Sequence, residues 1–169
     1  MAPGSQLTVR RAVADDWPAI WAIFRAVVAG GDTYAYPADI DEDAARTVWL
    51  HLDEGRTVTF VAEADGAVVG TALLKPNLPG LGDHVANAGW MVDPERAGQG
   101  IGRVFALGVI QEARELGFRA MQFNAVVATN ERALALWRSL GFAVVGTIPA
   151  AFRHSAEGET DLCIMYRSL

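Results

Sequence analysis

The stretch from Val85 to Ala128 constrains the fold more than any other part of this 169-residue chain. Apolar runs over 85–92 and 120–128 predict two strands, and the amphipathic segment between them, which ends at Gly117, predicts a helix. Two strands joined through a helix lie parallel and are connected by a right-handed crossover. The fold must therefore contain a sheet that is at least partly parallel and covered by a helix.

The remaining segments predict antiparallel strands and further helices. Asp65-Gly66 separates two β-branched runs and is a strong signal for a tight hairpin. A helix begins after Asp15-Asp16, where Asp supplies an N-cap acceptor, and it ends at Gly30. The other expected strands are 7–10, 56–63, 67–75, 142–148 and 161–166, and the other expected helices are 41–52 and 130–141. The predicted class is α/β (α+β mixed sheet), with one domain over residues 1–169 and helices on both faces of a central mixed sheet.

Composition excludes several classes of function. The chain is 51% hydrophobic and 20% charged, which is typical of a globular domain with a full core. Its net charge of -6 argues against nucleic-acid or anionic-membrane binding by the whole surface, although a local basic patch stays open. The single cysteine (Cys163) forms no disulfide within the chain, and the three histidines lack zinc-site spacing, so no metal is expected.

No targeting signal is expected. The segment MAPGSQLTVRR lacks an apolar stretch of signal-peptide length, and no run approaches the roughly 20 apolar residues of a membrane span. The expectation is a soluble cytoplasmic protein with neither a nucleic-acid nor a membrane partner.

The segment VDPERAGQGIGR, residues 92–103, carries the strongest chemical signal. A strand ends, three glycines follow at alternate positions, and a helix begins, so several backbone N–H groups are exposed at a helix N-terminus. Such a nest suits a diphosphate, and Arg96 and Arg103 bracket it. The spacing is neither the GxxxxGK[ST] phosphate loop nor the GxGxxG dinucleotide loop. The alternative is a glycine-rich turn without a ligand.

This segment resembles motif A of the GNAT superfamily of acyl-CoA N-acyltransferases, and NERALALWRSLGF, residues 130–142, resembles its motif B. The order of elements is similar to that of the family from Leu7 to Leu169. The resemblance implies a GNAT-like acyl-CoA N-acyltransferase fold and an N-acetyltransferase that uses acetyl-CoA as acyl donor.

The resemblance also implies the cofactor contacts. Loop amides would hold the pyrophosphate, the end of the preceding strand would pair with the pantetheine, and motif B would flank it. The N–H of Met91 or Val92 would also stabilise the charge on the reacting carbonyl. The implied cofactor residues are Met91, Val92, Arg96, Ala97, Gly98, Gln99, Gly100, Ile101, Gly102, Arg103, Asn130, Ala133 and Trp137.

Two positions depart from the family pattern. Ala97 stands where the family usually has Arg or Gln, a change that backbone amides should tolerate. Trp137 stands where the family often has a tyrosine that is credited with protonating the departing thiolate. An indole is not a comparable acid. Because a thiol has a pKa of about 8.5, its thiolate already leaves well, and Trp137 is expected mainly in the helix core.

Two asparagines mark the acceptor side. Asn87 and Asn124 lie on the two strands that diverge in the GNAT fold to admit the cofactor. A buried amide needs partners and offers both donors and an acceptor, so this pair could fix the amine and the carboxylate of one small substrate. The alternatives are structural amides or cofactor contacts. Tyr34 and Tyr36 either form a wall of the acceptor pocket or pack on the sheet.

No general base is obvious from the sequence. Amine attack on a thioester needs a neutral amine, and an alkylamine is mostly charged at pH 7, so a base or a water chain is expected. Glu63, Asp83 and His84 lie near the expected cleft, and His154 lies in the final hairpin region.

The predicted function is transfer of an acetyl group to a small amine by direct attack in a ternary complex. The segments NAGW, FNAV and TNERALALW resemble a GNAT subgroup that acetylates proline analogues such as azetidine-2-carboxylate, which suggests an amino acid or proline analogue as acceptor. The alternatives are a protein N-terminus, a polyamine or an antibiotic as acceptor, or a non-catalytic acyl-CoA-binding module. Many relatives form dimers, so a homodimer through the apolar C-terminal strand is a further possibility.

Overall fold

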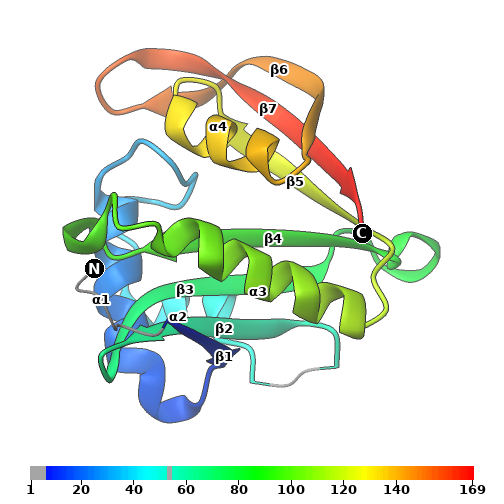
Figure 1. The fold of residues 1–169 in the computed structure, drawn as a ribbon. Helices are drawn as coiled ribbons and strands as arrows, with labels where there is room; N and C mark the ends of the chain where they lie inside the picture. Colours follow the sequence, from blue (N-terminus) through cyan, green and yellow to red (C-terminus); the bar gives the residue numbers. More distant parts are fainter. Residues whose placement is uncertain (1–6, 53–54) are drawn as a thin grey trace.

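The computed structural model describes residues 7–52 and 55–169, and its strands form one seven-stranded sheet in the order β1-β2-β3-β4-β5-β7-β6 (Figure 1). The strands are β1 (Thr8–Arg11), β2 (Val58–Ala64), β3 (Ala67–Pro76), β4 (Val85–Val92), β5 (Ala120–Val127), β6 (Ala143–His154) and β7 (Gly158–Ser168). The pair β4–β5 is parallel and the other neighbours are antiparallel. The predicted mixed sheet is confirmed. The first six residues of the N-terminal segment, for which no targeting signal is expected, lie outside the described residues.

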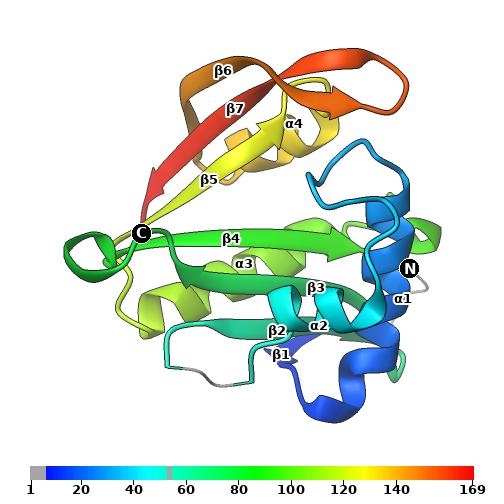
Figure 2. The ribbon, with the colours of Figure 1, turned by 180° about the vertical axis from the view of Figure 1, so that it is seen from behind.

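Helices cover both faces of this sheet, as predicted. The helices are α1 (Trp17–Ala29), α2 (Glu42–Trp49), α3 (Ile101–Glu115) and α4 (Glu131–Ser139). Helices α3 and α4 lie on one face, and α1 and α2 lie on the other, as the two opposite views show (Figures 1 and 2). Across the described residues, none of the helices combines the length and the apolar character that a membrane crossing needs.

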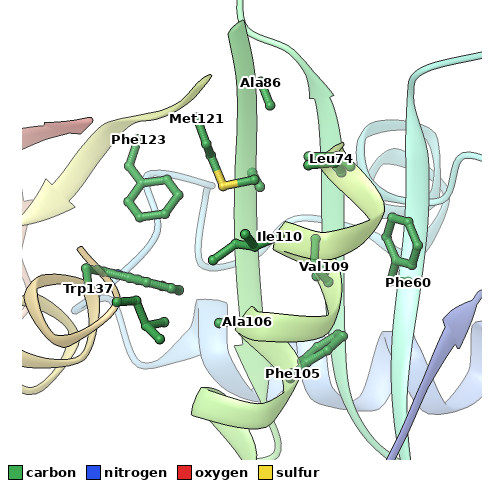
Figure 3. Packing of buried hydrophobic residues seen from close by; sticks show 14 of the residues in the cluster. Phe60, Leu74, Ala86, Phe105, Ala106, Val109, Ile110, Met121, Phe123 and Trp137 are labelled. Atoms are coloured by element: carbon green, nitrogen blue, oxygen red, sulfur yellow. The ribbon is translucent and has the colours of Figure 1, made fainter. Parts of the chain in front are cut away.

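Two apolar cores hold these layers together. Helix α3 packs Phe105, Val109 and Ile110 onto β2, β3 and β4, where side chains such as Phe60 and Leu74 are fully buried (Figure 3). The second core lies on the opposite face and packs α1 and α2 against the sheet. Both faces of the central strands are therefore buried, which explains why these strands read as nearly continuous apolar runs.

The hairpin between β2 and β3 follows the sequence signal directly. Asp65 has φ of 53° and Gly66 has φ of 76°, so both central residues of the two-residue turn lie in the left-handed region. This is the backbone that a type I′ hairpin turn demands and that an Asp-Gly pair favours.

The last two strands are longer than predicted. The sequence predicts strands over 142–148 and 161–166. In the structure β6 continues to His154 and β7 already begins at Gly158, so the two strands form a longer hairpin. The register shifts between Ile148 and Phe152, where Ala150 has φ of 50°. Pro149 interrupts the apolar alternation there, so the sequence pattern ends although pairing resumes beyond this bulge.

The sheet divides between β4 and β5, and this division positions the candidate site. The two strands pair only at Val85, Ala86 and Asn87, opposite residues 120–122. Beyond Asn87 they diverge, and β5, β6 and β7 fan away from β4 (Figure 1). One edge of β4 is therefore open over residues 88–92.

Asp16 is not the helix cap that the sequence predicts. It ends a short 3-10 turn (Ala14–Asp16) with φ of -75°, and its carboxylate makes no hydrogen bond that caps α1. Instead, Arg10 donates to both carboxylate oxygens at 2.7 and 2.9 Å, and the N–H of Val13 donates at 2.8 Å. Arg10 also donates to Glu63 on β2 at 3.0 Å. These hydrogen bonds tie the start of α1 to the edge of the sheet, so the carboxylate serves tertiary packing.

We expect Asp16→Asn to lower the free energy of unfolding by about 1–3 kcal/mol at pH 7, the range for charge-assisted hydrogen bonds. The hydrogen bond from Arg10 lowers the pKa of Asp16 below its ordinary value. A lowered folded-state pKa gives stability that is fully present above the unfolded-state pKa of about 3.9 and is lost as the pH falls through the folded-state value. Urea unfolding at pH 7 and below pH 3 measures this.

The difference between wild type and Asp16→Asn should shrink at the acidic end. Asp15→Asn, an exposed neighbour, is the control and should change stability little at either pH. A loss that is equal at both pH values would contradict the ion-pair account.

Candidate active site

A cavity of about 750 Å³ opens where β4 and β5 diverge. It is bounded by the glycine-rich loop and α4 on one side of β4, and by the loop after α1 on the other. Every site residue predicted from the sequence lines it except Gln99, which lies in the same loop without lining the cavity. These residues are Tyr34, Tyr36, Asn87, Met91, Val92, Arg96, Ala97, Gly98, Gly100, Ile101, Gly102, Arg103, Asn124, Asn130, Ala133 and Trp137.

The glycine-rich loop forms the cationic end of the cavity. Gly98 and Gly100 have φ of 83° and 79°, which side chains rarely adopt, and Gly100 is the N-cap of the 15-residue helix α3. The first N–H groups of a helix lack partners within it and favour an anion. Arg96, Arg103 and Arg132 line this end, so backbone and side chains supply positive potential at one place.

An aromatic wall leads from this loop into the gap between the strands. The Trp137 ring lies 4.9 Å from that of Trp90 and 4.7 Å from that of Phe123 (centroid distances), and Trp137 is 8% exposed. It therefore belongs to the core, as predicted, and also lines the cavity. The Trp90 Nε1 atom is buried and has no hydrogen-bond partner among the described residues, which suits a ligand that carries carbonyl groups along this wall. Asn130 caps α4 by accepting from Ala133 N at 3.0 Å.

The backbone of β4 alternates between its two neighbours. Val85 O accepts from Asn77, and Asp93 N donates to Val69, so odd-numbered residues of this strand direct their polar groups toward β3. The even-numbered residues face β5, and beyond Asn87 they face the gap. The N–H of Val92 consequently points into the gap, whereas that of Met91 points toward β3.

The opposite end of the cavity is an aromatic pocket. Tyr34, Tyr36, Trp49 and Leu73 line it, and the two tyrosine rings stack with centroids 6.0 Å apart. The Tyr34 hydroxyl donates to Trp90 O at 2.9 Å. Burial raises the pKa of both tyrosines above the ordinary value, so their hydroxyls stay protonated at neutral pH. The tyrosines thus both pack on the sheet and face the cavity.

Gly89 makes room for this arrangement. A Cβ atom at this position would lie 3.0 Å from the Tyr34 hydroxyl oxygen and 3.4 Å from the Trp49 ring. A larger residue at this position would push the tyrosine hydroxyl away from the strand by a few tenths of an ångström.

The amides form a connected group at the same end. Asn87 Nδ2 donates to Gln122 O at 3.0 Å across the last paired position of β4 and β5. Asn124 Nδ2 donates to Asn77 Oδ1 at 2.7 Å, and Gln122 Nε2 donates to Asn124 Oδ1 at 2.8 Å. Asn77 and Gln122 were not predicted as site residues from the sequence, because their roles depend on which strands pair. The bond to Gln122 leaves Asn87 Oδ1 as the acceptor that this amide can offer to a ligand.

No carboxylate lines the cavity among the described residues. Of the candidate bases, Glu63 accepts a hydrogen bond from Arg10, and Asp83 forms an ion pair with Arg56 at 3.7 Å. Neither of these carboxylates nor His84 lines the cavity. His154 lines a smaller neighbouring cavity of about 200 Å³. Within residues 7–52 and 55–169, no group of three or more His, Cys, Asp or Glu side chains could hold a metal ion.

Lys75 was also missed as a site residue. It lies at the end of β3 and lines the cavity away from the glycine-rich loop, and it is the only lysine of the chain. Its rarity was the available signal, but the sequence alone does not place it opposite Asn87.

Known proteins share this architecture. Residues 17–142 match the model of the acetyltransferase (GNAT) family. A GCN5-related N-acetyltransferase from Kribbella flavida is 46% identical with a TM-score of 0.92, over 96% of this chain and 98% of that one. A GNAT superfamily phosphinothricin acetyltransferase (Pat) from Sinorhizobium meliloti, solved in complex with AcCoA, is 25% identical with a TM-score of 0.86, over 96% and 88% of the two chains.

A further N-acetyltransferase is similar to this chain over a shorter span. N-acetyltransferase aca1 of Schizosaccharomyces pombe is 37% identical over 99 residues, which are 58% of this chain and 47% of that protein. This chain therefore spans about half the length of that curated relative. The family match and the near-complete superposition on the Kribbella flavida enzyme agree with the loop, the divided sheet and the cavity: the chain belongs to the GNAT family of acetyltransferases.

Proposed function

We propose that this protein transfers an acetyl group from acetyl-CoA to the amine of a small molecule, an amino acid or proline analogue. The observation that carries the proposal is one continuous cavity, which runs from a cationic glycine loop through the gap beside β4 to an aromatic pocket with amides. The Sinorhizobium meliloti relative, solved with AcCoA, supports the choice of donor.

The donor would extend along the cavity from the loop. Residues 98–103 would hold its pyrophosphate through backbone N–H groups, with Arg96, Arg103 and Arg132 nearby. The wall of Trp90 and Trp137 would flank the pantetheine, and the buried Trp90 Nε1 would donate to one of its carbonyls. When bound, acetyl-CoA supplies an activated acyl group, because a thiolate leaves readily.

The chain's own groups would act on either side of the reacting carbon. The N–H of Val92 faces the gap and would stabilise the charge that develops on the carbonyl oxygen. Asn87 Oδ1, held by the bond from Nδ2 to Gln122, would accept an N–H of the amine and orient it. The Tyr34 hydroxyl donates a hydrogen bond to the Trp90 carbonyl, so this carbonyl would not compete with Asn87 for the amine.

The proton of the amine would leave through water. The described residues that line the cavity include neither a carboxylate nor a histidine, so no side chain there is a general base near neutral pH. Trp137 contributes no acid, and the thiolate would depart unprotonated or take a proton from water.

We expect Asn87→Ala to lower kcat/KM for the acceptor by about 10- to 100-fold, the effect of losing one or two hydrogen bonds worth about 1–3 kcal/mol. The Kd for acetyl-CoA should stay within a factor of two or so, because Asn87 lies at the acceptor end of the cavity. Initial-rate assays of thiol release and calorimetric titration with acetyl-CoA measure the two effects separately. Equal losses in both would assign Asn87 a cofactor or structural role instead.

A further inference from the structure

We infer that Lys75 selects the acceptor by binding its carboxylate, so that the substrates of this enzyme are amines that carry an anionic group close to the nitrogen. This inference rests on the proposed acetyl transfer and names the feature of the acceptor that the site recognises. It follows from where the only lysine lies and from what surrounds it.

Lys75 and Asn87 occupy directly opposite positions on β3 and β4. Opposite residues of an antiparallel pair project from the same face, with Cβ atoms about 5 Å apart. The same face carries Leu73 opposite Gly89, and all four residues line the cavity. The ammonium group therefore belongs to the same pocket as the amide proposed to orient the amine.

Lys75 has no carboxylate partner in the part of the chain that the structure describes. It is exposed, and among the described residues no ion pair includes it. The cavity contains three arginines at the loop end, Lys75 at the other end, and no acidic side chain among the residues described, although the chain carries 20 acidic residues and a net charge of -6. A lysine ammonium is a compact charge with three donors on a flexible stem, so it can follow a carboxylate that varies in position.

The neighbouring amides complete a carboxylate site. Asn124 and Asn77 are joined by a hydrogen bond that uses the Oδ1 of Asn77, which leaves the Asn77 amide group as a donor. Asn124 also lines the cavity. Of these groups, Lys75 and Asn124 line the cavity, so their donors would bind the anion, while Asn77 holds the Asn124 amide and Asn87 Oδ1 offers the acceptor that an amine requires. Charge complementarity thus favours an amino acid over a polyamine, whose second cation would meet Lys75 without a compensating carboxylate.

The test compares kcat/KM for amino acids and for counterparts that lack the carboxylate. L-alanine with L-alaninamide, and azetidine-2-carboxylate with azetidine, are the probes for wild type, Lys75→Met and Lys75→Arg. We expect wild type to favour L-alanine about 10- to 100-fold, as for one charged hydrogen bond. This preference opposes the intrinsic chemistry, because the α-amino group beside an amide has a pKa of about 8 and offers more neutral amine.

Lys75→Met should reduce the preference to within about threefold, and Lys75→Arg should retain most of it. Arg25→Met removes the same charge from an exposed position of α1 outside the cavity, and it should leave the preference unchanged. Calorimetric titration with acetyl-CoA should give the same Kd for all four proteins, since Lys75 lies away from the phosphate loop.

Three results would overturn the inference, and only the last of them would also overturn the proposed function. Equal kcat/KM for the amino acids and for the counterparts that lack the carboxylate, or a preference that Lys75→Met leaves intact, would remove the role of Lys75 and leave the proposed function standing. Failure to acetylate any amine in the panel would remove the proposed function as well.

Discussion

Gly100→Val is expected to weaken acetyl-CoA binding about 100-fold while the protein stays folded. Gly100 begins α3 with φ of 79°, and for a β-branched residue this backbone is a strained outlier that costs about 1–3 kcal/mol. The strain is relieved if the loop moves, and that movement displaces the N–H groups proposed to hold the pyrophosphate. The position is exposed, and a Cβ there meets no atom within 4 Å, so the core is undisturbed.

Gly117→Val supplies a matched control for this prediction. Gly117 follows the other end of α3 with φ of 81°, a Cβ there also meets nothing within 4 Å, and the residue does not line the cavity. Both variants carry the same backbone strain, and calorimetric titration with acetyl-CoA should show the loss of affinity only for Gly100→Val. Equal Kd values for the two variants and wild type would show that the loop does not hold the donor.

Trp137→Ala is expected to lower the free energy of unfolding by about 3–5 kcal/mol, the range for removing a buried tryptophan. Trp137 contacts three aromatic rings, those of Trp90, Phe123 and Phe142, with centroids 4.9, 4.7 and 5.9 Å away. Figure 3 shows Trp137 on α4 beside Phe123 on β5. Because Trp137 also contacts Trp90 on β4, its loss should loosen the half of the sheet that carries β5. Urea unfolding followed by circular dichroism measures the change.

Trp137→Phe and Leu107→Ala bracket this prediction. Phenylalanine keeps part of the ring packing, so the first variant should lose less than the alanine variant does. Leu107 lies on α3 and is 46% exposed, so its truncation should change the free energy of unfolding by about 0.5 kcal/mol or less. If Trp137→Ala were as stable as Leu107→Ala, Trp137 would not be the packing centre of this half of the sheet.

The core of the fold was predictable because its signals are local. The Asp65-Gly66 turn, the strand over 85–92 and the helix between the two parallel strands each depend on a short pattern, and each is confirmed. The predictions failed where tertiary contacts outweigh local pattern. The Asp16 carboxylate accepts hydrogen bonds from Arg10 instead of capping α1. Strand β6 continues through a bulge that interrupts its apolar alternation.

The site was predictable only in part, for a similar reason. The residues drawn from motifs and from the two strand asparagines gather at one cavity, because they lie on segments whose order in the fold follows from the resemblance. Lys75, Asn77 and Gln122 required the register of β3, β4 and β5, which no composition or spacing supplies. The sequence contains a single lysine, Lys75, and only the register of β3 and β4 places it opposite Asn87.

Acetyl transfer from acetyl-CoA to an amine in this cavity can be measured directly. The most direct measurement incubates the full chain with acetyl-CoA and a panel of amino acids and proline analogues, and it follows thiol release together with the acetylated product by mass spectrometry. We expect thiol release that depends on the acceptor and is matched mole for mole by N-acetylated amino acid. Tight acetyl-CoA binding without any acetylated product across the panel would contradict it and would favour a module that binds acyl-CoA without catalysis.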